Sequence, residues 1–208
     1  MYLPAHFTER RVDVLHAFIE RHPLGTLVCS ADGAVQADHL PMLLRRDAPH
    51  GTLIGHVARA NPLWRMAGDG AEVLVVFAGA DAYVSPSWYP SKKAHGRVVP
   101  TWNYAVVHAR GRISLFDDEA RLHALVSSLT EHFERGQPAP WAVADAPDDY
   151  VRAMLRAIVG FEIEIRELVG KFKASQNRPA EDRAGVLAAL RAADDRDLTE
   201  LVRDPEKR

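Results

Sequence analysis

One segment of the sequence, residues 103–116, alternates apolar and polar side chains along its length. One face carries Ala105, Val107, Ala109, Ile113 and Leu115, and the other carries Tyr104, His108, Arg110, Arg112 and Ser114. A period of two places successive side chains on opposite faces of a β-strand. The segment therefore predicts a long strand with one face in the core and one polar face that meets water, a ligand or another subunit.

Further short segments rich in branched residues precede and follow it. We expect strands at 24–30, 35–45, 52–57, 73–77 and 161–170, with turn formers such as Asp32-Gly33 between them. The run 73–77 is apolar throughout and predicts a strand covered on both faces, followed by a turn at 79–81. Strands without βαβ alternation indicate an antiparallel barrel in an α+β fold.

Helical spacing predicts peripheral helices. The first begins at a Thr8 cap and ends before His22-Pro23, a second follows an Asp117 cap, and a third covers 148–158. Two short helices follow Pro179. For 208 residues we expect one main domain, 1–178, and a C-terminal helical appendage, 179–208.

Composition excludes several classes of protein. A net charge of −2 argues against coating nucleic acid by charge alone, and the single Cys29 excludes an intrachain disulfide. No apolar run reaches the ~20 residues that span a bilayer, so we expect a cytoplasmic protein without membrane contact. Histidine spacing predicts no metal site, although ligands from separate strands, such as His39, His56 and His108, stay open.

Several sequence blocks together resemble one family. They are MYLPAHF at 1–7, HLP at 39–41, GHVARANP at 55–62, YVSPSWY at 83–89, VPTWNY at 99–104 and GKFKASQNR at 170–178. In this order they resemble the PaiB family of FMN-binding negative transcriptional regulators. The resemblance implies a split β-barrel of the pyridoxamine-phosphate-oxidase type, FMN as cofactor, and a homodimer with flavin at the subunit interface. Asp38 and Ala174 depart from the family pattern.

The first group of candidate FMN-binding residues lies around the block 55–62. Arg59 is expected to bind the phosphate, because a guanidinium bonds phosphate bidentately. Asn61 is expected to cap the helix that follows Pro62. Other candidates are His56 and Val57 at the end of the strand, and His39 and Leu40 on the preceding strand.

The second group lies near the block 170–178. Lys171, Ser175 and Gln176 supply a cation and polar groups after a strand, and Trp102 is an aromatic residue that can stack on the flavin or close a dimer interface. Plain packing explains Trp102 equally well.

No pair of residues is identified as a general acid and base, so the catalytic residues stay unknown and any chemistry belongs to the flavin. The sequence leaves three functions open: a negative regulator of transcription, an FMN-dependent oxidoreductase, and a haem-binding relative. Direct DNA binding has little support, since Asp194, Asp195 and Asp197 in the tail would repel phosphate.

Overall fold

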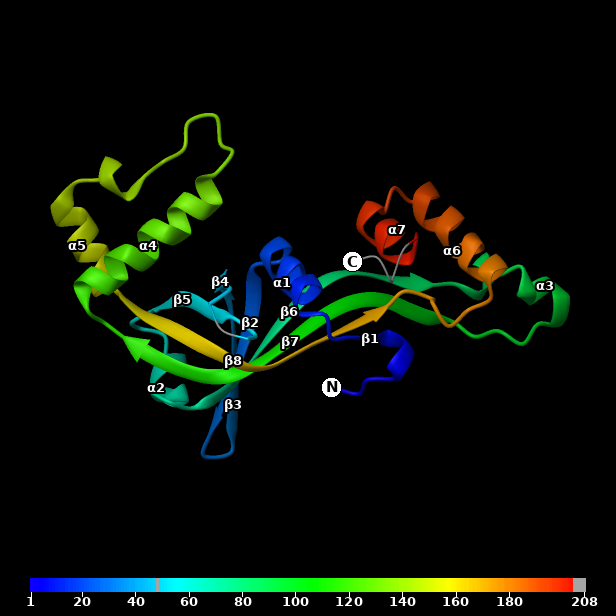
Figure 1. The fold of residues 1–208 in the computed structure, drawn as a ribbon, viewed down its shortest axis with the longest axis horizontal. Coiled ribbons are helices and arrows are strands. Elements are labelled where there is room, and N and C mark those ends of the chain that lie inside the picture. The colour runs from blue at the N-terminus through cyan, green and yellow to red at the C-terminus, as the bar shows by residue number, and fades with distance from the viewer. Residues whose placement is uncertain (48, 204–208) are drawn as a thin grey trace. The chain divides into compact units, whose positions relative to one another are not determined.

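A computed structural model describes residues 1–47 and 49–203, drawn in Figure 1. The chain divides into two compact units. Unit 1 comprises Met1–Phe18, Ala78–His108 and the chain from Val169 onward, and unit 2 comprises Ile19–Phe77 and Ala109–Leu168. Three long strands contribute residues to both units.

The strands, in chain order, are β1 (Thr8–Glu9), β2 (Leu24–Ala31), β3 (Ala34–Pro41), β4 (Leu43–Arg45), β5 (Thr52–Ala58), β6 (Glu72–Val84), β7 (Thr101–Phe116) and β8 (Ile158–Lys173). They form one sheet with the order β3-β2-β6-β7-β8-β5-β4, and β1 pairs with β8. The registers of β2 with β3 and β6, of β5 with β4 and β8, and of β1 with β8 are antiparallel. The first and last strands of this order do not pair, so the sheet is not closed. The antiparallel sheet with peripheral helices confirms the predicted α+β fold with an antiparallel split barrel.

The helices are α1 (Val12–Arg21), α2 (Leu63–Ala67), α3 (Ser91–His95), α4 (Glu119–Glu134), α5 (Asp148–Arg156), α6 (Ala180–Ala192) and α7 (Arg196–Arg203). Short 3-10 turns are η1 (Ala5–Phe7), η2 (Pro86–Trp88) and η3 (Val143–Asp145). Two helices, α6 and α7, occupy the predicted appendage, of which residues 204–208 lie outside the described residues. The division of the chain at residue 178 stays a prediction.

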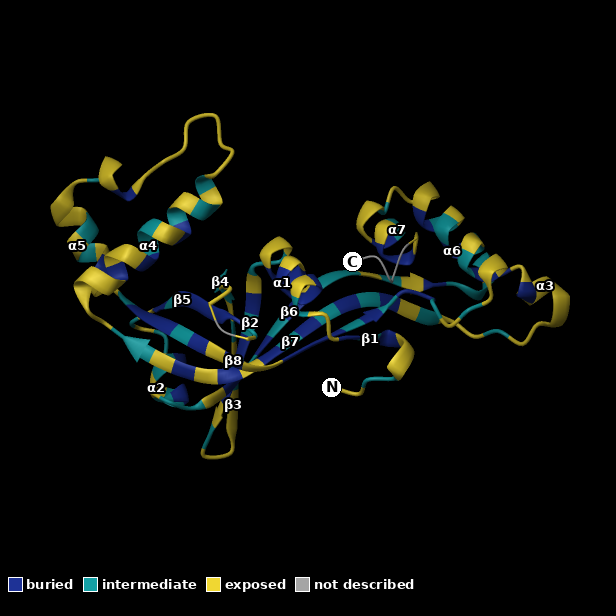
Figure 2. Cartoon of the chain, in the orientation of Figure 1, coloured by how far each residue is buried: buried dark blue, intermediate teal, exposed yellow. Residues whose placement is uncertain are grey.

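The alternation in β7 is confirmed. Ala105, Val107, Ala109 and Ile113 are buried, while Leu115 is half-buried (Figure 2). Gly111 occupies the same alternating face, and a Cβ there would lie 2.2 Å from the Glu164 carbonyl oxygen of β8. In unit 2, therefore, β7 and β8 approach so closely that only glycine fits.

Two strand predictions were wrong. The turn expected at 79–81 does not form, because β6 continues without a break from Glu72 to Val84. Leu74 and Val76 are only half-buried, so the apolar run in β6 buries one face fully and the other in part. The segment expected as one strand at 35–45 is two strands, because the buried Met42 between them bonds to the Pro23 carbonyl oxygen at 2.9 Å.

Three helix termini also differ from expectation. Thr8 belongs to β1, and the Glu9 carboxylate accepts the backbone N–H groups of Arg10 and Arg11 just before α1. Asp118 rather than its neighbour caps α4, accepting from Arg121 N at 2.9 Å. The helix predicted over 148–158 ends at Arg156 because β8 begins two residues later.

Within unit 1, α6 is fixed to the η2–α3 segment. The buried Asp182 carboxylate accepts from Ser91 N at 3.1 Å and from Ser91 Oγ at 2.6 Å. Gly185 of α6 lies so close to η2 that a Cβ would be 2.0 Å from the Trp88 carbonyl oxygen. The described tail is thus packed tightly on this segment.

No helix within residues 1–47 and 49–203 is long and apolar enough to cross a membrane.

The Gly185 contact predicts that a glycine-to-alanine substitution, which usually stabilises a helix, destabilises this one. Glycine to alanine inside an open helix stabilises by about 1 kcal/mol, whereas Gly185→Ala should destabilise unit 1 by roughly 1–3 kcal/mol through overpacking against backbone. Urea unfolding of both proteins measures the difference. The control is Ala188→Gly, at an exposed position of α6, which should cost about 1 kcal/mol from propensity alone. A more stable Gly185→Ala variant would contradict the contact.

Candidate functional site

The predicted site residues fall into two groups, one in each unit. His39, Leu40, His56, Val57, Arg59 and Asn61 lie in unit 2, and Trp102, Lys171, Ser175 and Gln176 lie in unit 1. The residues of the first group lie in different environments within unit 2, and those of the second group lie around the end of β8 and the start of β7 in unit 1.

In unit 2, a polar network links β3 to the loop between β5 and α2. Asn61 Nδ2 donates to Asp38 Oδ1 at 3.1 Å, and Gln36 Nε2 donates to Asp38 Oδ2 at 3.0 Å. Asn61 Oδ1 in turn accepts from Leu63 N at 2.8 Å, next to the start of α2. Asp38, the departure from the family pattern, therefore positions Asn61. Burial, and then the charge of Asp38, raise the pKa of the Cys29 thiol.

The Arg59 side chain is engaged by hydrogen bonds and an ion pair within the chain. Its Nε donates to the Arg156 carbonyl oxygen at 2.8 Å and its Nη2 to the Ile158 carbonyl oxygen at 3.0 Å. Its Nη1 forms an ion pair with Asp117 at 3.4 Å. These contacts connect the end of β5 to the junction of α5 and β8. The predicted role of Arg59 at the FMN phosphate stays a prediction.

The other predicted residues of unit 2 differ in their environment. Val57 is buried in the core, whereas His39 is exposed and pairs with Thr26 across β2 and β3, next to the pair of Leu40 with Gly25. His56 lines a cavity under α4 and α5. Its Nδ1 is buried without a hydrogen-bond partner among the described residues, and burial lowers the pKa of the ring.

In unit 1, three cations lie near the end of β8. Burial, and then the charges of Lys171 and Arg178, lower the pKa of Lys173. Lys173 Nζ donates to Thr101 Oγ1 and to the Trp102 carbonyl oxygen at the start of β7. Among the described residues, no carboxylate lies within ion-pair distance of these three cations. Their charge is therefore uncompensated by ion pairs.

Aromatic rings surround this cationic cluster, which we define as Lys171, Lys173 and Arg178. Lys171 Nζ lies 5.5 Å from the Tyr104 ring centroid and 5.6 Å from that of Tyr2. Two exposed rings, Tyr83 and Trp102, form an edge-to-face pair with centroids 6.0 Å apart. The combination of cations with flat apolar rings suits a ligand that has both an anionic and an aromatic part.

Ser175 and Gln176 stabilise the chain that carries the cationic cluster. Ser175 is buried and bonds to the buried Asn103, with Ser175 Oγ 3.0 Å from Asn103 Nδ2 and 3.2 Å from Asn103 Oδ1. Gln176 bonds to the backbone at both ends, donating to the Phe172 carbonyl oxygen at 2.6 Å and accepting from Ala174 N at 2.7 Å. In this structure the hydrogen bonds of both side chains are made to other residues of the chain.

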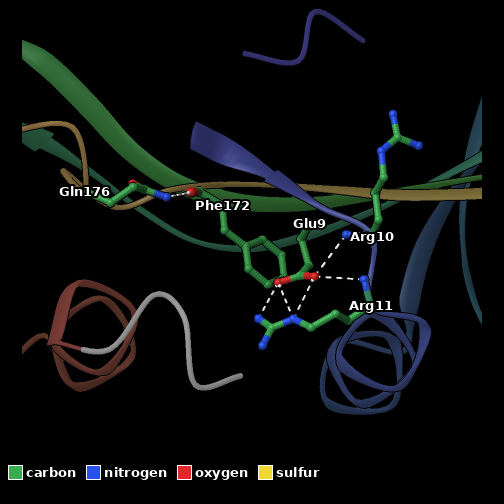
Figure 3. A network of polar contacts seen from close by, with 5 residues as sticks. All are labelled: Glu9, Arg10, Arg11, Phe172 and Gln176. Atoms are coloured by element: carbon green, nitrogen blue, oxygen red, sulfur yellow. Dashed lines mark hydrogen bonds and ion pairs between the residues drawn. The ribbon is translucent and has the colours of Figure 1, made fainter. Parts of the chain in front are cut away.

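A second polar network in unit 1 surrounds Glu9 (Figure 3). Its carboxylate accepts from Arg11 Nε at 3.0 Å and from Arg11 Nη2 at 2.6 Å, as well as from two backbone N–H groups. Burial raises the pKa of Glu9, but the hydrogen bonds and the charge of Arg11, together with the Arg10 N–H group, hold it below its usual value. A hollow of about 330 Å³ borders this pair, and Gln176 on its wall bonds to the backbone through both its amide nitrogen and its amide oxygen. The network is therefore structural.

Several of these residues are not among those predicted from the sequence. Asn103 is one, although a polar side chain on the apolar face of β7 is a signal for a buried hydrogen bond. Lys173 and Arg178 are visible in the block 170–178. Lys173 follows Lys171 at a spacing of two on β8, whereas Arg178 comes after the turn at Ser175, whose φ is +61°. The Glu9–Arg11 pair gives no pattern beyond two charges at close spacing.

The chain is similar to several known proteins. Residues 1–167 match the family model described as "Putative FMN-binding domain". The Bacillus subtilis Protease synthase and sporulation protein PAI 2 is 31% identical over 100% of this chain and 99% of its own length. An uncharacterized protein of Aspergillus fumigatus is 34% identical over 90% of this chain and 89% of its own.

Solved structures share the fold at low sequence identity. The FAD and haem binding protein from Mycobacterium smegmatis has a TM-score of 0.62 and 18% identity, covering 86% of this chain and 79% of that one. The flavocytochrome Anf3 from Azotobacter vinelandii has a TM-score of 0.61 and 15% identity, covering 88% of this chain and 78% of that one. The fold thus places the protein in the split-barrel class. More particularly, the chain belongs to the FMN-binding domain family that includes PaiB, and its cofactor is FMN.

Proposed function

We propose that this chain binds FMN at the cationic cluster of unit 1 and works as a homodimeric negative regulator of transcription that does not itself contact DNA. The observation that carries the FMN assignment is the set of cations without ion-pair partners beside exposed aromatic rings. The regulatory part follows from the resemblance to PaiB, whose Bacillus relative is named for protease synthase and sporulation.

The phosphate of FMN is a dianion and needs a cation that has no carboxylate partner. Lys171 meets this requirement best, since its ammonium lies near two aromatic rings and has no hydrogen bond or ion pair to the described residues. Lys173 adds positive charge nearby although it bonds to Thr101 and Trp102. Arg59 meets the requirement less well, because two backbone carbonyls and Asp117 already accept from its guanidinium.

The isoalloxazine ring is flat and needs an apolar surface. The exposed edge-to-face pair of Trp102 and Tyr83 offers this surface in the same unit as Lys171. Bound FMN supplies electron transfer at its ring. The residues of this chain bind and orient it. An FMN-dependent oxidoreductase would use the same site, with a substrate placed against the free face of the ring.

The first test is the affinity for FMN. Lys171→Met keeps the aliphatic stem but removes the charge, so FMN should bind roughly ten- to a hundredfold more weakly, the value of one charge-assisted contact of about 1.5–3 kcal/mol. Titration of apoprotein with FMN, followed by flavin fluorescence, gives the dissociation constant. The absorption spectrum of the purified protein should show a flavin band, and a Soret band instead would favour the haem alternative.

Two further variants locate the phosphate. Arg191→Ala, in the exposed last turn of α6, is the control for loss of a positive charge and should bind FMN like wild type. Arg59→Met should lower the stability of the protein because the hydrogen bonds to the Arg156 and Ile158 carbonyl oxygens are lost. It should leave the affinity of the folded protein for FMN unchanged. If Arg59→Met weakens FMN binding and Lys171→Met does not, the phosphate belongs to the loop after β5.

The homodimer is supported by exposed apolar side chains in unit 1. Val99, Trp102 and Tyr83 are 63%, 52% and 48% exposed. Large exposed apolar residues of this kind mark interaction surfaces. Light scattering at micromolar concentration should give twice the 23.1 kDa chain mass. Val99→Glu should shift the protein toward monomer, while Lys93→Glu, on the exposed α3, should not. A wild-type monomer at that concentration would refute the dimer.

A cytoplasmic location stays a prediction.

The absence of direct DNA contact is supported by the charges around α7. Asp194, Asp195 and Glu200 are acidic, Asp194 pairs with Arg196 at 3.4 Å, and Asp195 Oδ1 accepts from Leu198 N at the start of the helix. Phosphate would be repelled here. In a gel-shift assay at about 0.1 M salt, the flavin-loaded protein should not retard duplex DNA from upstream of its own gene at micromolar concentration. Retardation that Arg196→Ala and Arg203→Ala abolish would show that α7 binds DNA.

A further inference from the structure

A cavity of about 210 Å³ lies in unit 2 between β5 and the segment formed by α4, η3 and α5. Apolar side chains dominate its lining, among them Val126, Val143, Leu155 and Ile158. No lysine or arginine of the described chain lines it. Its volume exceeds that of a cavity of roughly 150 Å³ that accepts benzene in another protein. It can therefore accept one or two fused rings but has no partner for a phosphate.

The imidazole of His56 faces this cavity from β5. Neither ring nitrogen has a hydrogen-bond partner among the described residues, and Nδ1 is fully buried. Burial lowers the pKa of the ring and so favours its neutral form. A buried polar group without a partner is costly. A ligand group that bonds to the imidazole would remove this cost, which is a reason for a ligand to bind here.

The mouth of the cavity carries large exposed side chains. Trp141, Tyr150 and Met154 line the cavity and are 48%, 57% and 47% exposed. Figure 2 shows α5 and the chain between α4 and η3 largely exposed. Ligand sites commonly combine an apolar lining with few polar groups. The hollow beside Glu9 lacks this property, since Glu9 and Arg11 bond to each other and Gln176 bonds to the backbone.

We propose that this cavity binds a small aromatic molecule that carries one hydroxyl or carbonyl group, and that His56 forms the hydrogen bond to that group. The apolar lining receives the rings, and Trp141 and Tyr150 cover them. The site is separate from the FMN site proposed in unit 1 and does not depend on it. It would give the protein a second ligand besides its flavin.

The test compares two probes that differ by one hydroxyl group. Calorimetric titration of the flavin-loaded protein should show binding of both 1-naphthol and naphthalene, with 1-naphthol the tighter. His56→Phe keeps an aromatic ring of similar shape but removes the hydrogen bond, so it should weaken 1-naphthol about three- to tenfold and leave naphthalene unchanged or tighter. Ala146→Phe, which fills the cavity, should weaken both probes at least about tenfold.

Control measurements distinguish this cavity from the flavin site and from nonspecific binding. His95→Phe, an exposed histidine in unit 1, should change neither probe. FMN should bind His56→Phe with the wild-type dissociation constant, and a parallel loss of FMN would instead place His56 in the flavin site and overturn the proposal. Equal weakening of both probes by His56→Phe would also overturn it, as would the absence of binding to wild type at millimolar probe. In that last case a partner subunit over Trp141 and Tyr150 becomes the occupant.

Discussion

The hydrogen-bonded pair of Asn103 and Ser175 is the contact on which the cationic part of unit 1 depends. Both side chains are buried, and each satisfies the other. Ser175 has a φ of +61°, a conformation that costs a non-glycine residue energy. The pair stabilises the turn at Ser175, because breaking it would leave a buried amide without a partner, at a cost of about 1–3 kcal/mol. It thereby holds the end of β8 against the start of β7, where Lys173 reaches Thr101 and Trp102.

The strands are predictable where side chains alternate, and less so where backbone geometry decides. β7 follows its hydrophobic pattern because it buries one face, and β8 follows its pattern from Phe161 to Arg166, whereas three successive residues, 168–170, are buried further along β8. The glycine and alanine residues after Phe77 indicate a turn, yet β6 continues through them because small residues are also tolerated in a paired strand. Glycine alone does not distinguish a turn from a close approach of two backbones, as Gly111 demonstrates.

Residue type predicts the candidate site less well, because a side chain's chemistry does not reveal its partners. Arg59 is a cation in a loop, but the carbonyl groups of Arg156 and Ile158, far along the chain, accept from it. Lys171 is also a cation near the end of a strand, and among the described residues it has no such acceptor. The difference lies in long-range contacts that no local pattern contains.

The two proposed sites illustrate how one chain separates two kinds of recognition. Positive charge gathers in unit 1, where Lys171 and Lys173 follow each other at a spacing of two on β8 and so lie on one face of the strand. In unit 2, His56 faces an apolar lining to which the described chain contributes no lysine or arginine. The apolar lining around His56 offers no cation to an anionic cofactor. The cations of unit 1 contribute little binding energy to a neutral aromatic molecule. The same chain can therefore bind a flavin and a neutral aromatic ligand without competition for one surface.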